Sequence, residues 1–477
     1  MMKKIILTVL SIVALVSCQS DEQYEDHNRD PKNPTQIDAD FLYNNAVKSL
    51  VDQMTSTNVN TNVYRLFAQY WTETTYIEES NYDLNTRNIP QNHWSEMYRD
   101  VLLDLTTAKE IVNNNSALTE SDKKSRIAQA EIIMIYTWQQ MVDTFGDIPY
   151  TDALGDKTLP TYDDDAAIYA NLIVRLNAAI PDITNQGFGS TDKLYGGDVT
   201  SWKKFANSLK LKLGIRIADV TSMQSLAQTT VQSAVSAGVF TSNSDNASFP
   251  YEGATPNTNP VWNSLVESGR ADFVAANTIV DIMNTLGDDR RPFYFRQNVG
   301  AGIYKGGTYG AVSNYFTNSQ PGDIMYQPTT PASLIDYSEI SFFLAEAAER
   351  SFVGTPANAA GHYNNAITAS FNYWGAPNVA SYLLKPAVAY ATAAGSWKQK
   401  IGTQFWLAMY NRGFEGWTVW RKYDAPTFNL PDETGNPVPT RYTYPVNEQN
   451  LNPANWTAAS TAIGGDKQTT KVFWDVN

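Results

Sequence analysis

The sequence has almost no cysteine: Cys18 is the only one among 477 residues. A chain with a single cysteine forms no internal disulfide, and it has none of the paired C-x-x-C patterns that hold structural zinc. Histidine is scarce too, since His27, His93 and His362 stand far apart and no H-E-x-x-H pair occurs. These absences exclude a disulfide scaffold and a zinc hydrolase of that type, so a large core must stabilise the fold alone.

Other signals of chemistry and of membranes are missing as well. No G-x-S-x-G elbow occurs, and the glycine-rich stretch 302–310 lacks P-loop spacing. The acidic stretch 162–169 lacks the glycine and glutamate of an EF-hand loop. Beyond the first 17 residues no apolar run reaches the ~18 residues that a membrane-spanning helix needs. We therefore predict no catalytic residue, no metal and no cofactor.

The chain has little positive charge for its length, with 35 Lys and Arg against 49 Asp and Glu and a net charge of −14. An acidic surface repels phosphate backbones, which argues against a nucleic acid partner. Aromatic residues are plentiful, with 27 Tyr, 12 Trp and 19 Phe. Most of these rings are expected in the core. Rings that stand among Asn, Thr and Gln suit sugar or peptide binding, because a ring face covers the C–H groups of a ligand while polar neighbours form hydrogen bonds with its hydroxyls.

The N-terminus has the pattern of an exported lipoprotein. Two lysines precede an apolar run, Ile5 to Val16, which is too short to span a bilayer and suits a secretory signal. Leu-Val-Ser-Cys, ending at Cys18, resembles a bacterial lipobox, so we predict a signal peptide over 1–17 and a lipid anchor on Cys18. The acidic tether 18–35 resembles the signal that exports lipoproteins of Bacteroidetes to the outer face of the outer membrane. A plain secretory signal followed by an ordinary charged tether is the alternative.

Helical periodicity dominates from Ile37 onward. Apolar residues spaced as one helical face requires predict helices over 125–145, 200–220, 336–352 and 358–374. Thr161 and Asp164 have the spacing of a capping box ahead of a further helix. Segment 240–331 is instead rich in Asn, Gly, Thr, Ser and Pro, which predicts long irregular loops. Loops of this length often carry function.

Six motifs resemble one family when they are taken in order. They are DTFGDIPY, YGGDVTSWKKFANSLKLKLGIR, YSEISFFLAEAA, QFWLAMYNRGFEGWTVWRKYDAPTF, RYTYPVNEQNLN and KVFWDVN. Together with the lipobox and the acidic tether, they are similar to the SusD/RagB family of outer-membrane nutrient-binding lipoproteins. The short tether with DPKNPT looks most like the branch called SusD-like type two.

The resemblance implies a mostly α fold. Four tetratricopeptide-like helix pairs would form the scaffold of a single SusD-like domain over 36–477, and long irregular loops with minor β structure would carry the ligand site. Members of the family bind oligosaccharides, or in some cases peptides, and deliver them to a SusC-like TonB-dependent transporter without doing chemistry. A surface glycoside hydrolase stays open as an alternative, because 49 acidic residues make a pair of carboxylates easy to find.

Two motifs also predict local ion pairs. We expect Glu415 to pair with Arg421, and Glu448 to pair with Arg441 in a buried contact that ties down a loop. Gly146 in DTFGDIPY is expected to end a helix in a left-handed conformation.

Aromatic residues that stand among polar and turn residues, and not on the apolar stripe of a helix, are the main candidates for ligand contacts. The first group lies in the stretch after the first helix, and the second lies in the irregular segment. The predicted ligand-binding residues are Trp71, Tyr76, Tyr82, Trp262, Arg270, Tyr304 and Tyr309, with Asn81 and Asn259 as hydrogen-bonding neighbours.

Overall fold

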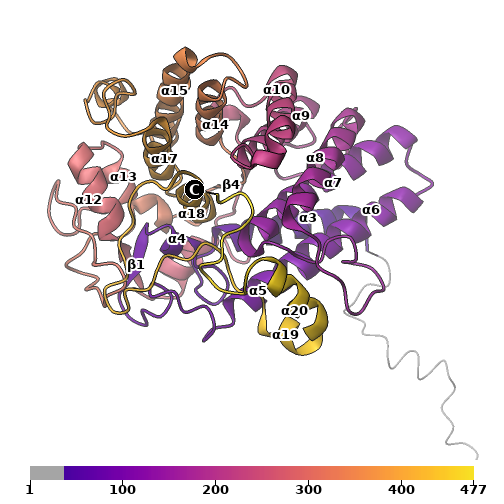
Figure 1. Cartoon of the computed structure of the whole chain (residues 1–477), viewed down its shortest axis with the longest axis horizontal. Helices are drawn as coiled ribbons and strands as arrows, with labels where there is room; N and C mark the ends of the chain where they lie inside the picture. Colours follow the sequence, from indigo (N-terminus) through magenta and orange to yellow (C-terminus); the bar gives the residue numbers. More distant parts are fainter. Residues whose placement is uncertain (1–36, 477) are drawn as a thin grey trace, which may run out of the picture.

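The structure, a computed structural model, describes residues 37–476. The predicted signal peptide, the predicted lipid anchor at Cys18 and the predicted tether 18–35 lie outside the described residues. The described chain is mostly helical, as predicted. In Figure 1 its helices form a broad arc over the top and the sides of the view, with loops and the strand β1 at the lower left. Among residues 37–476, no helix combines the length and the apolar character needed to cross a bilayer.

Four helix pairs follow one another along the arc. Each pair packs against the next, α6 on α7, α8 on α9 and α9 on α14, which is the stacking expected of a tetratricopeptide-like scaffold. Of two further helices, α17 packs against α14, and α18 packs against α17 and α4. The bounds of the pairs are α3 (Ala39–Thr55) with α6 (Asp104–Asn114), α7 (Glu120–Phe145) with α8 (Asp165–Asp182), α9 (Val199–Arg216) with α10 (Gln224–Ala237), and α14 (Tyr337–Glu349) with α15 (Pro356–Trp374).

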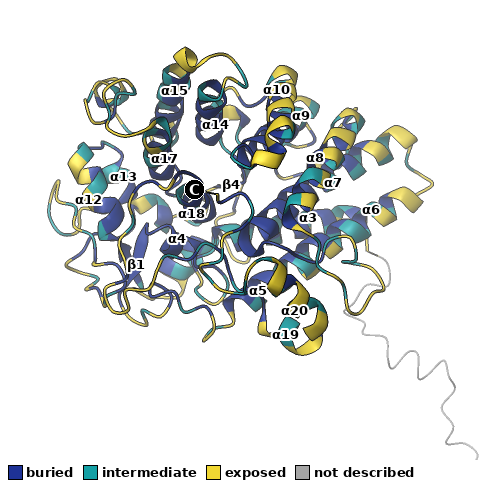
Figure 2. Ribbon diagram, in the orientation of Figure 1, coloured by how far each residue is buried: buried dark blue, intermediate teal, exposed yellow. Residues whose placement is uncertain are grey.

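The remaining helices, most of them shorter, connect or cover this scaffold. Figure 2 shows that the scaffold helices bury the faces turned toward one another and expose the others. The remaining helices are α4 (Tyr64–Phe67), α5 (Ile89–Ser95), the π-helix η1 (Glu96–Leu103), α11 (Pro260–Trp262), the π-turn η5 (Asn263–Glu267), α12 (Asn277–Leu286), α13 (Arg291–Tyr294), α16 (Val379–Leu383), α17 (Trp397–Ala408), α18 (Gly413–Tyr423), α19 (Val446–Leu451) and α20 (Pro453–Ala462).

The capping-box expectation at the start of α8 is wrong. Asp164 itself is the N-cap, and its carboxylate accepts the backbone N–H of Ala167 at 2.8 Å. The hydroxyl of Thr161 donates instead to Asp152. Gly146 ends α7 with φ +79° and ψ −128°, so its φ is positive, as a glycine permits, but the residue is not left-handed helical.

A buried charge network joins the scaffold to α18, and it replaces the predicted pair between Glu415 and Arg421. Lys212 of α9 forms ion pairs with Glu415 of α18 and with Glu339 of α14, the latter at 3.1 Å. Arg412 binds Glu339 at 2.6 Å. Burial acts to raise the pKa of Glu415, but Lys212, Arg412 and Arg216 outweigh it and lower that pKa to about 2.

The second predicted ion pair is wrong as well. Arg441 forms an ion pair with Asp466 at 2.7 Å and donates to the carbonyl of Phe145 at 2.9 Å, so it satisfies the last turn of α7. Glu448 accepts the hydroxyl of Tyr162 at 2.7 Å. The C-terminal loops are therefore tied to α7 and to the segment before α8, because a buried carbonyl or carboxyl needs a partner.

The irregular segment is rich in loops, as predicted, and the longest of its short helices is the ten-residue α12. Two short antiparallel ladders fasten it to the scaffold. β1 (Trp71–Glu73) pairs with β3 (Phe273–Ala275), so Trp71 stands opposite Ala275 and Glu73 opposite Phe273. β2 (Ser248–Phe249) pairs with β4 (Ala332–Ser333). The first ladder brings two distant loops to one place, and that place forms the candidate site.

Candidate functional site

A cleft of about 580 Å³ opens at the end of the β1–β3 ladder. Three segments meet there: the loop after α3, the chain from β1 onward, and the chain from η5 to β3. A volume of this size is typical of ligand sites in proteins. The lining residues are Thr57, Asn58, Val59, Asn60, Glu73, Thr75, Tyr76, Arg87, Asn263, Ser264, Ser268, Arg270, Asp272 and Phe273.

The ladder register sets the position of the two main walls. Beyond the last strand pair, Thr74 donates its backbone N–H to the carbonyl of Asp272 at 2.9 Å and its hydroxyl to the carbonyl of Ala271 at 2.6 Å. These bonds extend the pairing by one residue and fix the point where the strands diverge. The segments 75–87 and 263–272 therefore face each other across the cleft.

Tyr76 gives the cleft an exposed aromatic ring. Its side chain is 64 % exposed, and its φ of +54° lies in the left-handed region. A tyrosine in that region costs on the order of 1 kcal/mol, and such residues persist where the surrounding structure holds them. A buried anchor lies close by, because Asn81 donates to the carbonyl of Gly310 at 2.8 Å. An exposed ring on a held backbone is suited to stacking against a ligand.

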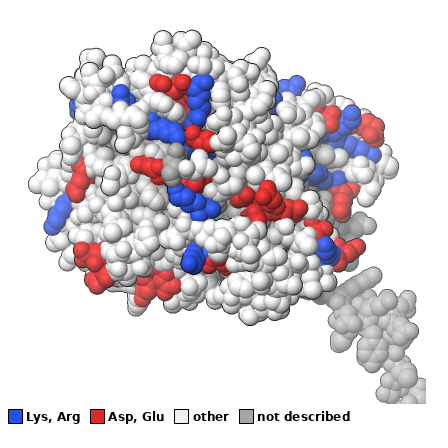
Figure 3. Space-filling view, viewed as in Figure 1, with Lys and Arg blue, Asp and Glu red and all other residues white. Residues whose placement is uncertain are grey.

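The two arginines in the lining are paired. Arg270 forms an ion pair with Asp272, and Arg87 forms one with the buried Glu79. The carboxyl group of Glu73 is buried and accepts hydrogen bonds from Ser80. The remaining polar lining consists of hydroxyls and amides, which donate and accept hydrogen bonds without a net charge. The face shown in Figure 3 also has its acidic and basic side chains scattered among uncharged ones. The cleft therefore offers hydrogen bonds and one exposed ring rather than a strong electrostatic field.

Two of the predicted ligand residues, Tyr76 and Arg270, line this cleft. A third, Trp262, is half-buried in α11, directly before the lining residue Asn263. Tyr76 lies almost 200 positions before Trp262 and Arg270, and the β1–β3 ladder brings the two segments together. Their role as ligand contacts stays a prediction.

Three other predicted residues lie inside the core. Trp71 is fully buried and donates its indole N–H to the hydroxyl of Tyr410 at 2.9 Å. Tyr82 is 3 % exposed and accepts a hydrogen bond from Gln69, and Tyr309 is 1 % exposed and donates to the carbonyl of Leu66 at 2.8 Å. Because these rings pack against protein on all sides and their polar atoms are satisfied, we correct the assignment and remove them from the candidate site.

The last predicted residues have structural partners. Tyr304 is half-buried beneath the guanidinium of Arg291, 5.2 Å from its ring centre, and does not line the cleft. Asn259 accepts the N–H of Val261 at 2.8 Å as the N-cap of α11 and donates to the carbonyl of Thr330 at 2.7 Å. Asn81 and Asn259 both act as ties between loops.

The sequence reasoning missed the wall formed by the loop after α3. Asn58 and Asn60 are exposed there, and Thr57 and Val59 complete the wall. The run STNVNTN at 56–62 has no helical stripe and directly follows a helix. That short polar run is the signal that indicates this part of the site.

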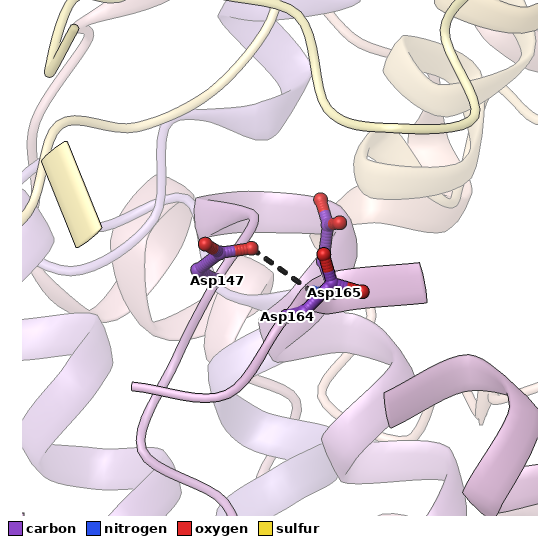
Figure 4. A group of neighbouring side chains, drawn as sticks. All are labelled: Asp147, Asp164 and Asp165. Atoms are coloured by element: carbon purple, nitrogen blue, oxygen red, sulfur yellow. Dashed lines mark hydrogen bonds between the residues drawn. The ribbon is translucent and has the colours of Figure 1, made fainter. Parts of the chain in front are cut away.

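A group of carboxylates lies elsewhere, at the start of α8 (Figure 4). The oxygens of Asp147, Asp164 and Asp165 lie within 4.8 Å of one another, an arrangement that could hold a cation. Asp147 accepts the N–H of Asp165 at 3.0 Å, and Asp164 is the N-cap. Both bonds satisfy free N–H groups at a helix N-terminus, where negative charge is favourable. This capping role accounts for the group.

The histidine near the scaffold core has no access to a ligand. His93 is fully buried between Gln53, 2.8 Å from its Nδ1, and the hydroxyl of Tyr64, 3.2 Å from its Nε2. Burial lowers its pKa to about 3, so the ring is neutral at physiological pH. This histidine packs the interior.

Stacked helix pairs form the scaffold of this protein, and its irregular segments form a polar cleft. The chain is therefore a helix-repeat protein with a site in its loops. The chain belongs to the SusD-like family described as "Starch-binding associating with outer membrane", whose family model matches residues 31–445. No curated protein sequence matches the chain.

Solved structures share this fold over nearly the whole chain. A chitin-binding protein has 26 % identity and a TM-score of 0.78, with 92 % of this chain and 100 % of that chain covered. A chitin-binding SusD homologue from Flavobacterium johnsoniae has 24 % identity and a TM-score of 0.78, with 92 % and 99 % covered. A SusD homologue from Bacteroides uniformis has 25 % identity and a TM-score of 0.78, with 92 % and 100 % covered.

Proposed function

We propose that this protein binds oligosaccharides in the cleft at the end of the β1–β3 ladder. The observation that carries the proposal is the lining itself: the exposed ring of Tyr76 beside hydroxyls and amides from three segments. A sugar presents C–H groups on one face and hydroxyls at its edges, so a ring and a fringe of hydrogen-bonding groups suit it. The family description and the chitin-binding relative point to the same class of ligand.

The charge balance of the cleft favours a neutral glycan. Each arginine in the lining has its own carboxylate partner, Asp272 for Arg270 and Glu79 for Arg87. A strongly anionic ligand that drew Arg87 away would leave the buried carboxyl group of Glu79 without its partner, which costs free energy. Fragments of starch or of chitin carry no charge and avoid that cost.

The wider role rests on the sequence and on the family. We infer that Cys18 carries a lipid anchor that holds the protein on the outer membrane, facing the cell exterior, and that the bound sugar is delivered to a SusC-like TonB-dependent transporter. One acyl chain holds a protein only marginally, and stable anchoring takes at least two. No chemical step is assigned to the protein.

The test is isothermal titration calorimetry with a panel of starch fragments, chitin fragments and peptides, with each mixture assayed for cleavage products. We expect one class of sugar to bind without cleavage, with a dissociation constant between about micromolar and about millimolar, or roughly 4 to 8 kcal/mol. Binding of peptides alone would replace the sugar by a peptide ligand. Release of shorter sugars would instead establish a glycoside hydrolase.

A further inference from the structure

Two acidic side chains are buried beside the cleft. Glu73, the last residue of β1, lines the cleft and is only 2 % exposed. Glu79 comes from the segment that forms the wall, and its side chain has no exposure. Two carboxyl groups in one buried place repel each other if both are ionised, so their hydrogen bonds decide the protonation state.

The bonds around the pair leave one acceptor without a donor. One oxygen of Glu73 accepts both the N–H of Ser80 at 2.9 Å and the hydroxyl of Ser80 at 2.6 Å. One oxygen of Glu79 is held by Arg87, while its other oxygen, Oε2, is buried without a partner. Glu79 directly precedes Ser80 in the chain, and Ser80 binds Glu73, so the two buried carboxyl groups lie next to each other. Because ionised carboxylates only accept, a hydrogen bond between them requires one proton.

The charges facing the pair do not compensate two negative groups. Arg87 supplies one positive charge, and it is already bound to Glu79. In the segment before β3, Arg270 is paired with Asp272. The loop 306–313 contributes the phenol of Tyr309, which is neutral.

Burial and the neighbouring acid raise the pKa of Glu73 well above its ordinary value. Burial also raises the pKa of Glu79, although Arg87 opposes that shift. Of the two, Glu73 is therefore the group that holds the proton, and Glu79 is the ionised partner of Arg87.

We propose that Glu73 and Glu79 share one proton, that this proton holds segment 73–87 in the shape that forms the cleft, and that ligand binding therefore weakens as pH rises. The segment carries both Tyr76 and Arg87, which line the cleft. Loss of the proton places two buried negative charges side by side, and their repulsion displaces the backbone that positions Tyr76. The coupling to a ligand rests on the proposed sugar binding, whereas the shared proton does not.

The sign of the effect follows from proton counting. The folded, ligand-bound form keeps a proton that an unfolded or displaced segment releases once the pH exceeds the ordinary glutamate pKa of 4.5. Affinity is thus greatest at low pH and falls by up to about tenfold per pH unit above the pKa of the pair in the folded protein. A glutamine at position 73 keeps a donor toward Glu79 at every pH.

The first experiment measures the proton without a ligand. Infrared difference spectra of the full chain, recorded from about pH 5 to about pH 9, follow the C=O stretch of a protonated carboxylic acid. Because Asp165 also carries a proton near neutral pH, the readout is the wild-type spectrum minus the Glu73→Gln spectrum. We expect this difference to show a protonated-carboxyl band at neutral pH. Glu78→Gln is the matched control, because Glu78 is exposed in the same segment, and its spectrum should equal that of the wild type in this region. A band of equal intensity in the wild type and in Glu73→Gln would overturn the shared proton.

The second experiment measures calorimetric affinity for chitin and starch fragments over the same pH range. We expect the wild type and Glu78→Gln to lose affinity as pH rises, and Glu73→Gln to lose this pH dependence. A wild-type affinity that is constant with pH, or the same slope in Glu73→Gln, would overturn the coupling while sugar binding stands. Absence of sugar binding at every pH would overturn the proposed function and the coupling together, and the infrared band would still decide the proton.

Discussion

Replacement of Glu415 by Gln tests how much the buried charge network stabilises the scaffold. Glu415 is almost fully buried and lies against three cations: Lys212 in direct contact, Arg216 at 3.6 Å and Arg412 at 3.7 Å. At an effective dielectric constant of about 20, each unit pair near 4 Å contributes about 4 kcal/mol of attraction. The cost of taking the charges out of water offsets part of that attraction, and removing one partner of such a network typically costs about 3 to 5 kcal/mol.

The assay is denaturant unfolding of the wild type, Glu415→Gln and a control, Glu110→Gln, which changes an exposed glutamate on α6. We expect Glu415→Gln to lose about 3 to 5 kcal/mol at neutral pH, and the control to stay within about 0.5 kcal/mol of the wild type. The pKa of Glu415 is lowered from 4.5 to about 2 in the folded protein, so its contribution is present above 4.5 and is lost as pH falls toward about 2. Equal stability of the two variants would refute the reasoning.

Further predictions concern the cleft, the start of α8 and the anchor. Tyr76→Ala should weaken sugar binding about tenfold or more while the melting temperature is kept, because a stacked ring is lost; unchanged affinity by calorimetry would remove Tyr76 from the site. Trp262→Ala should weaken binding in the same assay without unfolding the protein. Burial and the charge of Asp147 raise the pKa of Asp165 from 3.8 to about 7. The folded state therefore holds a proton, and its stability falls as pH rises from about 4 to about 7. Asp165→Asn should flatten the plot of unfolding free energy against pH over this range, and an unchanged plot argues against the shift. Cys18→Ser should move the protein from the membrane to the soluble fraction, and retention in the membrane would contradict the lipid anchor.

Helical periodicity predicted the scaffold well. The predicted helix over 200–220 is α9, Val199–Arg216, and the predicted helix over 358–374 is α15, Pro356–Trp374. Both have apolar stripes of large residues, and such stripes determine which face is buried whatever the neighbours are. The loop-rich nature of the irregular segment was equally readable from its glycine, proline and asparagine content.

The site was harder to predict, because exposure depends on partners that are distant in the sequence. Tyr76 and Tyr82 have similar polar neighbours, yet one is exposed at the cleft while the other is buried. Tyr309 lies in a glycine-rich loop but packs inward, with its hydroxyl bound to Leu66. The ion pairs failed for the same reason: Glu415 bonds to Lys212, some 200 positions away, rather than to the nearby Arg421.

The central claim is that a neutral sugar binds in the cleft at the end of the β1–β3 ladder. A crystal structure of the protein soaked with the sugar that binds most tightly in calorimetry tests this claim most directly. We expect electron density for the sugar against the ring of Tyr76. The sugar should form hydrogen bonds with the side-chain amides of Asn58, Asn60 and Asn263 or with the hydroxyls of neighbouring lining residues. Density for the sugar at another surface, with the cleft occupied by water alone, would contradict the account.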